Sequence, residues 1–115
     1  MSLVFKIAIS DGIAVVSFKG KILTDSHLEK LNTEIGTQTL EKTTNWIFDF
    51  DQLTHINSSG INFIIRSLTR SRINCGDLVL CSIKGNVKTL FEIGKINEIF
   101  SIYSTTSDAI NHFKK

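Results

Sequence analysis

Residue types that could carry out chemistry gather between positions 49 and 58 of this chain. Asp49 and Asp51 end an apolar run, and residues two apart on a strand point to the same side. Both carboxylates could therefore meet one magnesium ion, as in a phosphotransferase. The alternative is that Asp51 is a turn or cap residue, a common role for aspartate. The pattern leaves open a metal site and a structural role.

Ser58 lies three residues after His55, which raises the question of a serine nucleophile with a histidine base. The G-x-S-x-G motif of serine hydrolases requires glycine at position 56, where this chain has Ile56. His27, His55 and His112 otherwise lie at polar positions and are predicted to be surface imidazoles. The spacing therefore disfavours a small hydrolase that acts through Ser58, although a hydrolase remains one alternative function.

The residues from Asn57 to Gly60 lie between a strand pattern and a helix pattern. Short polar side chains cap a helix by accepting from N–H groups that have no intrahelical partner, and Gly60 lets the backbone turn tightly. Ser58 is therefore predicted to lie in a strand-to-helix turn, either only as a cap or as an exposed hydroxyl on a docking surface.

The helix after Gly60 has two contrasting faces. Its apolar stripe has the spacing i, i+3, i+4, i+7 and consists of Ile61, Ile64, Ile65 and Leu68. At 100° per residue, Phe63, Arg66 and Arg70 fall about 140–200° away from Ile61. This geometry predicts an exposed aromatic beside two arginines, which would suit partner binding. The alternative is that Phe63 is only a partly covered surface residue.

The composition is that of an ordinary globular domain. The chain has 115 residues, 42% apolar and 21% charged, with a net charge of +2, so we expect one domain spanning residues 1–115. Positive charge is dispersed, which argues against a nucleic-acid partner. No stretch reaches the roughly 20 apolar residues of a membrane span, and the amino terminus has no signal-peptide profile. We therefore expect a cytoplasmic protein without a membrane partner.

The two cysteines match neither a zinc pair nor a redox CxxC motif. Cys81 ends an apolar strand pattern, and Cys75 lies in a turn between Asn74 and Gly76. Both are predicted to be structural thiols. No phosphate-binding glycine loop is present either, so we expect no metal and no cofactor.

The first half of the chain predicts a hairpin, a helix and a central strand. Residues 5–9 alternate like a half-buried strand, Asp11-Gly12 turns the chain, and residues 13–18 return as a second strand. Ser26 and Glu29 form a capping box for a helix that ends before Asn45. Residues 46–50 are nearly all apolar, as in a strand covered on both faces.

The second half alternates strands and helices. Strands are predicted at residues 78–81 and 99–103, a helix capped by Asn86 and ended by Gly94 lies between them, and Thr105 or Thr106 caps a last helix. The order is ββαβαβαβα. It predicts an α/β fold with four helices and a mixed, mostly parallel sheet that begins with an antiparallel hairpin.

The run from Asp51 through Leu53, Ile56 and Asn57 to Ile61, with residues 81–83, 87–91 and Ile99, resembles the STAS family. In particular it is similar to the bacterial anti-anti-sigma factors, which are antagonists of anti-sigma kinases. The resemblance covers nearly the whole chain, and the predicted element order is that family's order.

The resemblance implies a small non-enzymatic switch. In such families the serine aligned with Ser58 is phosphorylated by a partner serine kinase that is also the anti-sigma factor. The unphosphorylated form binds that kinase and frees a sigma factor, and a PP2C-type phosphatase resets the cycle. Nucleotide is bound by the kinase. The partner-binding residues would be Asn57, Ser59, Gly60, Phe63, Arg66 and Arg70.

Two positions depart from the family pattern. Asn57 replaces an aspartate, which removes a negative charge beside Ser58, and Lys21 stands where many relatives have an acidic residue. Some relatives work without modification, as scaffold or accessory subunits of signalling or transport complexes. A constitutive scaffold is therefore the alternative to a phosphorylation switch.

Overall fold

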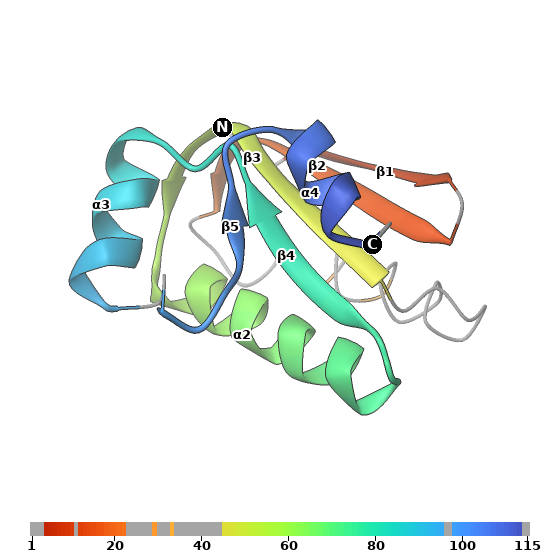
Figure 1. Ribbon diagram of the computed structural model, residues 1–115. Helices are drawn as coiled ribbons and strands as arrows, with labels where there is room; N and C mark the ends of the chain where they lie inside the picture. The colour runs from red at the N-terminus through yellow and green to blue at the C-terminus, as the bar shows by residue number, and fades with distance from the viewer. Residues whose placement is uncertain are drawn as a thin grey trace.

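A five-stranded sheet forms the middle of the protein (Figure 1). The computed structural model describes residues 4–10, 12–22, 29, 33, 45–95 and 98–113. The strands lie side by side in chain order and are β1 (Val4–Ser10), β2 (Ile13–Ile22), β3 (Asn45–Ile56), β4 (Asp77–Cys81) and β5 (Ile102–Tyr103). β1 and β2 are antiparallel, and every other neighbouring pair is parallel. The predicted mixed sheet with an amino-terminal hairpin is confirmed.

Three helices pack around this sheet in the described part of the chain: α2 (Ser58–Ile73), α3 (Gly85–Ile93) and α4 (Thr106–Phe113). The helix predicted after Ser26 lies outside the described residues apart from Glu29 and Thr33. Both are helical, and Thr33 Oγ1 donates to the Glu29 carbonyl at 3.0 Å. Among the described helices, none combines the length and the apolar character that a membrane crossing requires.

The side of the sheet that faces α2 and α3 carries the larger core. Phe18, Phe48 and Phe50 pack there edge to face or stacked, with ring centroids 5.2–6.4 Å apart. In Figure 1, α2 lies below the strands and α4 lies in front of them. The opposite side is smaller, and there Ala109 of α4 packs with Ile47 and Val79. The predicted burial of the central strand on both faces is confirmed.

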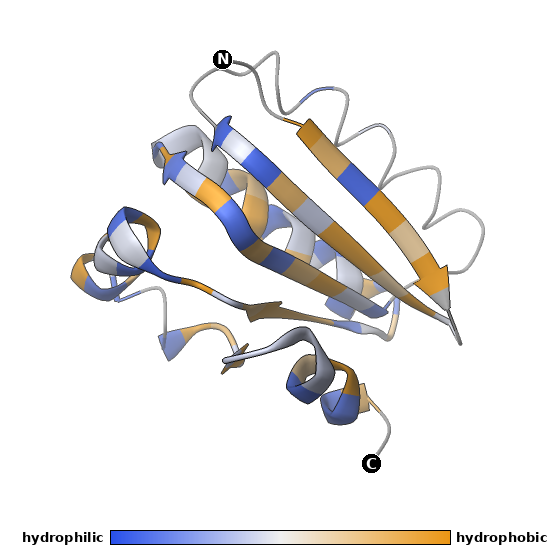
Figure 2. Cartoon of the chain, turned by 90° about the horizontal axis from the view of Figure 1, so that it is seen from above, coloured by the Kyte–Doolittle hydropathy of each residue, from blue (hydrophilic) through white to orange (hydrophobic). Residues whose placement is uncertain are grey.

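β3 is longer than the apolar run predicted, because it continues from Phe50 to Ile56. β2 runs beside it to Ile22, with two register shifts that accommodate extra residues in β3. Asp51 is therefore a strand residue, and the prediction of a turn or cap there is wrong. Figure 2 shows why the apolar run ended earlier than the strand, since hydrophilic residues interrupt the hydrophobic ones towards the carboxyl end of β3.

Smaller differences concern the ends of elements. β5 has only two residues, where a strand from Ile99 was predicted, and Ile99 is largely exposed. The N-cap of α3 is Lys84 in place of the predicted Asn86. The cap of α4 is as predicted, because Thr105 Oγ1 accepts from the Asp108 N–H at 3.2 Å.

Candidate functional site

Asn57 caps the helix that carries Ser58. Its backbone is extended, its Oδ1 accepts from the Gly60 N–H at 2.9 Å, and its carbonyl accepts from the Ile61 N–H at 3.0 Å. An amide oxygen serves here as well as a carboxylate would, because the cap needs only an acceptor. Asn57 therefore supplies the cap at this strand-to-helix junction.

Ser58 is the first residue of α2, where its side chain is exposed. Its hydroxyl makes no hydrogen bond with any described residue. The alternative in which Ser58 serves only as the cap is wrong, since its neighbour Asn57 supplies the capping oxygen. The hydroxyl is therefore sterically available at the end of the helix where backbone N–H groups point outward.

Ser59 and Gly60 follow in the first helical turn. Ser59 is half-buried, and Gly60 lies on the buried side of α2. The prediction that Gly60 makes a tight turn is wrong, because this glycine is helical and its φ is not among the positive values. A small residue at this position lets the start of the helix approach the sheet closely.

Phe63 does not lie on the surface. Its side chain is 2% exposed and stacks on Phe48 with ring centroids 6.2 Å apart. The prediction of an exposed aromatic is therefore wrong. The buried face of α2 consists of Gly60, Phe63, Ile64, Ser67, Leu68 and Ser71. Counting only large apolar residues placed the stripe too far round the helix, because three of its six members are small.

The buried serines explain how a polar residue fits this face. Ser67 Oγ donates to the Phe63 carbonyl at 2.9 Å, one turn back along the helix. A serine in this arrangement satisfies its own hydroxyl and occupies little volume. Ser67 can therefore lie between α2 and the sheet while its hydroxyl stays hydrogen-bonded.

The arginines of α2 remain accessible. Arg66 is exposed and Arg70 is half-buried, and the two are one turn apart. Arg72 is exposed, and its Nε lies 3.7 Å from Oδ1 of the half-buried Asp77. Of the residues predicted to bind a partner, Arg66 and Arg70 thus keep their predicted accessibility, whereas Phe63 does not.

The aspartates of β3 make hydrogen bonds within the protein. Asp49 Oδ1 accepts from the Asp51 N–H at 3.0 Å, and Asp51 Oδ1 accepts from Lys84 Nζ at 3.0 Å. The hydrogen bond from Lys84, followed by that from Gln52, lowers the pKa of the Asp51 carboxyl. In the part of the chain that the structure describes, no three metal-ligating side chains gather at one place.

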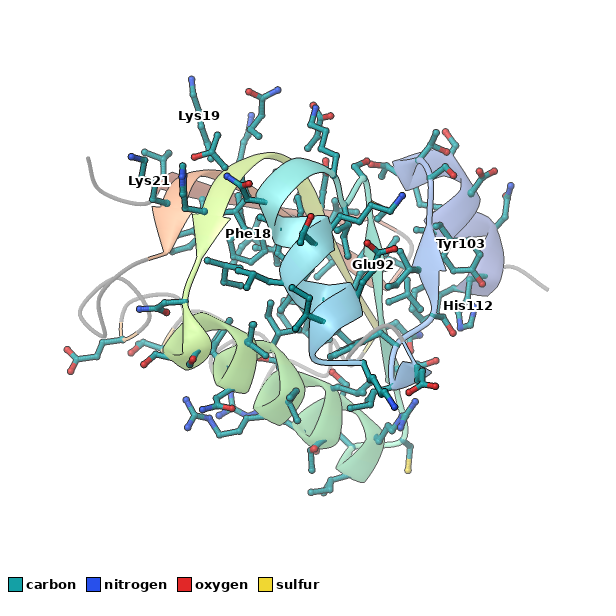
Figure 3. The ribbon with its side chains drawn as sticks, turned by 90° about the vertical axis from the view of Figure 1, so that its left-hand side faces the viewer. Phe18, Lys19, Lys21, Glu92, Tyr103 and His112 are labelled. Carbon is teal, nitrogen blue, oxygen red and sulfur yellow. The ribbon has the colours of Figure 1, made fainter. Side chains whose placement is uncertain are left out.

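His55 is exposed, as predicted for a surface imidazole, whereas His112 differs from that prediction. His55 Nδ1 lies 3.0 Å from Thr54 Oγ1, and within the described residues no hydrogen bond joins its ring to Ser58. His112 is half-buried and connects two strands, with Nε2 3.1 Å from Asp77 Oδ2 and Nδ1 2.7 Å from Tyr103 Oη. Figure 3 shows Tyr103 and His112 side by side. His27 lies outside the described residues.

Sequence reasoning missed the contact of His112 because its partners lie 35 and 9 residues away, in β4 and β5. No local spacing signals such a contact. The two cysteines fit their predictions, since both are free, Cys75 is exposed after α2 and Cys81 is buried. Burial raises the pKa of the Cys81 thiol.

The basic residues at the end of β2 lie at the same end of the sheet as His55. Lys21 pairs with His55 across the two strands, and Lys19 pairs with Gln52. In Figure 3, Phe18 points into the core while Lys19 and Lys21 point away from it. Lys21 of β2 therefore places a positive charge beside His55, close to the end of β3 and the start of α2.

Comparisons with known proteins agree on one family. The sequence profile of the STAS domain family matches residues 5–109. One similar protein is BtrV from Bordetella bronchiseptica, which carries the provisional name of an anti-sigma factor antagonist. It is 27% identical over 104 residues, which cover 90% of this chain and 89% of BtrV.

Solved structures share the fold at low sequence identity. An anti-sigma factor antagonist from Mycobacterium paratuberculosis is similar with a TM-score of 0.85 and 18% identity, over 99% of this chain and 96% of that protein. The antagonist SpoIIAA in its unphosphorylated form has a TM-score of 0.77 and 18% identity, over 96% of this chain and 98% of SpoIIAA. The phosphorylated form of SpoIIAA, described as a Bacillus cell fate determinant, has a TM-score of 0.77 and 17% identity, over 96% of this chain and 99% of that protein.

Proposed function

The chain belongs to the STAS domain family, and from that premise we propose that it is an anti-sigma factor antagonist switched by phosphorylation of Ser58. Residues 1–115 would act as one binding module without catalytic activity of its own. In the unphosphorylated state it would bind an anti-sigma serine kinase and so release a sigma factor. A PP2C-type phosphatase would reset it.

The observation that carries this proposal is that Asn57, and not Ser58, caps α2. Asn57 makes the capping hydrogen bond, and the Ser58 hydroxyl is exposed and makes no bond with a described residue. A kinase could therefore modify Ser58 without breaking a contact that holds α2. A capping serine would instead lose its hydrogen bond on modification, at a cost of about 0.5–2 kcal/mol.

Electrostatics at the start of α2 also favour a phosphate. Phosphorylation adds about 1.5 to 2 negative charges at neutral pH. The first turn of α2 contains no acidic residue, so the new charge meets no repulsion from that turn. The helix dipole and the free N–H groups attract anions at this end. We therefore expect the phosphorylated protein to keep its fold.

The switch would act on binding. We place the kinase contact on the accessible surface of α2 around Ser58, with Asn57, Ser59, the backbone at Gly60, Arg66 and Arg70 as contact residues. Phe63 is not part of this set, because its side chain is buried. A phosphate facing an unmatched partner surface would be desolvated without a compensating charge, which can cost several kcal/mol. ATP would be bound by the kinase, and the cycle would run in the cytoplasm, where sigma factors act.

A structural relative supports the idea that this fold tolerates such a charge. SpoIIAA has been solved in phosphorylated and unphosphorylated forms, and this chain has the same TM-score of 0.77 with each. The alternative function is a constitutive scaffold subunit.

The charge of the surface around Ser58 bears on its partner. Asn57 in place of aspartate and Lys21 in place of an acid make this surface more positive than the family pattern. The partner surface would therefore carry complementary acidic residues.

The first test is the intact mass of the protein purified from its own cells, with peptide mapping from Ile56 to Arg66. We expect one phosphate, located on Ser58. A Ser58→Ala variant should lose it, whereas the matched Ser59→Ala variant should keep it. Absence of phosphate in all growth conditions would favour the constitutive scaffold.

The second test measures binding to an anti-sigma serine kinase of the same organism by calorimetry. Ser58→Asp should weaken the complex at least about tenfold, since it introduces an unmatched interface charge. Ser58→Ala should bind like the unmodified protein. Equal affinity of the Ser58→Asp variant and the wild type would contradict the switch.

A further inference from the structure

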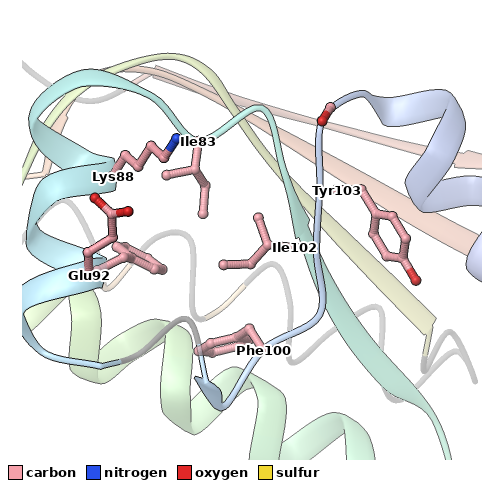
Figure 4. A pocket seen from close by; sticks show the side chains of 8 residues that line it. Ile83, Lys88, Glu92, Phe100, Ile102 and Tyr103 are labelled. Atoms are coloured by element: carbon pink, nitrogen blue, oxygen red, sulfur yellow. The ribbon is translucent and has the colours of Figure 1, made fainter.

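A hollow of about 410 Å³ opens between α3 and β5, on the face of the sheet that also carries α2 (Figure 4). Its base is formed by the buried rings of Phe91 and Phe100, and Ile83 and Ile102 line its walls. Ile102 is 38% exposed, because no other side chain covers it within the described residues. The volume lies within the range of about 300–1,000 Å³ that is usual for small-molecule sites.

The hollow opens beside the carboxyl ends of two parallel strands. Ile83 follows the end of β4 by two residues, and Ser104, which also lines the hollow, directly follows β5. Ligands of open α/β sheets bind beside the carboxyl ends of the strands. Ser82, with a φ of 61°, turns the chain out of β4 and donates its N–H to the Tyr103 carbonyl at 3.1 Å.

The Tyr103 side chain does not fill this space. Figure 4 shows its ring on the far side of β5 from Ile102. There its hydroxyl lies 2.7 Å from His112 Nδ1. Because adjacent strand residues point to opposite faces, the Tyr103 ring lies away from the side of β5 on which Ile102 lines the hollow.

Two opposite charges stand on the α3 wall. Lys88 and Glu92 are one turn apart, both are exposed, and both line the hollow. Among the described residues they form no ion pair with each other or with another side chain. Figure 4 shows them next to each other at the opening. A ligand that entered here would meet an ammonium and a carboxylate at the same rim.

These charges discriminate between classes of ligand. A simple carboxylate would be attracted by Lys88 and repelled by Glu92, and a simple amine would experience the reverse. A molecule with both groups beside an apolar tail satisfies both side chains at once. We propose that the hollow binds a free amino acid with an aliphatic or aromatic side chain, its carboxylate at Lys88, its ammonium at Glu92 and its side chain against Phe91, Phe100 and Ile102.

The test is a titration of the isotope-labelled full chain with L-leucine and L-phenylalanine, followed by amide chemical shifts. We expect shifts at residues around the hollow. Leucine should bind at least about tenfold more tightly than isocaproate, which lacks the ammonium, isoamylamine, which lacks the carboxylate, and glycine, which lacks the apolar side chain. Binding of isocaproate or isoamylamine as tight as that of leucine would overturn the proposal.

Charge variants provide a sharper test, because Lys88 and Glu92 are exposed and their replacement should not affect folding. Glu92→Gln should weaken leucine binding and strengthen isocaproate binding. Lys88→Gln should weaken leucine binding and strengthen isoamylamine binding. Lys95→Gln is the matched control, since Lys95 is exposed and does not line the hollow. Shifts elsewhere in the protein, no shifts at all, or equal effects of all three variants would overturn the proposal.

Discussion

The two faces of the sheet are stabilised in different ways. Under α2 and α3, Phe18, Phe48, Phe50 and Phe63 form a cluster of rings that excludes water. Under α4 the apolar cluster is small, and a polar chain from Tyr103 through His112 to Asp77 adds to it. The difference teaches that a short helix with little apolar area can be held on a sheet by hydrogen bonds to side chains of two strands.

The polar chain follows from the hydrogen-bonding capacity of its groups. The Asp77 carboxylate accepts, so His112 Nε2–H donates to it, and the Tyr103 hydroxyl pairs with Nδ1, to which it donates when the imidazole is neutral. His112 lies in the last turn of α4 and contacts Asp77 at the start of β4 and Tyr103 in β5. Loss of its ring should therefore loosen the carboxyl-terminal helix before the aromatic core responds.

The largest effect should come from the aromatic face. Phe63→Ala should lower the free energy of unfolding by about 3–5 kcal/mol, because it removes a buried ring that stacks on Phe48. Denaturant unfolding measures this loss. The matched control is Arg66→Ala on the exposed side of α2, which should change stability by less than about 0.5 kcal/mol. Similar small effects for both variants would restore the prediction of an exposed Phe63.

The next effect should come from the polar face. His112→Ala should cost about 1–3 kcal/mol, because it leaves Asp77 and Tyr103 without their shared partner. Tyr103→Phe should cost about 0.5–1.5 kcal/mol, as expected for one hydrogen bond. Hydrogen exchange should show faster opening of α4 in both variants. Strictly additive losses in the double variant would contradict a connected chain, since residues in one network couple.

A moderate effect should come from the start of α2, where Asn57 makes a polar contact at the edge of the aromatic face. Asn57→Ala should lower the free energy of unfolding by about 0.5–2 kcal/mol, because the Gly60 N–H loses its acceptor. Ser58→Ala is the matched control and should leave stability within about 0.5 kcal/mol. Thermal unfolding distinguishes them. A larger loss for Ser58→Ala than for Asn57→Ala would return the capping role to Ser58.

The smallest effect on stability should come from ionisation of the Cys81 thiol, which lies under α4. Burial raises the pKa of its thiol, so the folded state holds this proton more tightly than the unfolded chain. Stability should therefore be unaffected below about pH 9 and fall as the pH rises further, because only the unfolded chain ionises readily. A Cys81→Ala variant should fall less steeply. In the native protein a thiol reagent should modify Cys75 and spare Cys81, and equal reaction rates would contradict this burial.

The fold class could be predicted because its signals are local. The alternation of residues 5–9, the Asp11-Gly12 turn and the apolar runs of β3 and β4 are readable from neighbouring residues. The hairpin, the parallel order and the cap at Thr105 are confirmed accordingly. The ends of β3 and β5 could not be predicted, because strand length depends on which neighbouring strand supplies hydrogen bonds.

The candidate site was predicted in part for the same reason. The short polar side chains of Asn57 and Ser58 predict a strand-to-helix junction. Which of the two residues caps the helix depends on the backbone angles of the turn. Phe63 was misplaced because Gly60, Ser67 and Ser71 contribute to the buried face without a hydrophobic signal. Small residues add nothing to a count of apolar periodicity, yet they determine which face of the helix can pack closely against the sheet.

The amino-acid sequence by itself determined the order of elements, the apolar strands and the serine at the start of α2, since each depends on residues close in the chain. Only the tertiary structure decided that Phe63 is buried, that Asp51 pairs with Lys84, and that His112 joins Asp77 to Tyr103. These contacts connect residues 9 to 35 positions apart, and no local rule specifies which distant side chains packing will bring together.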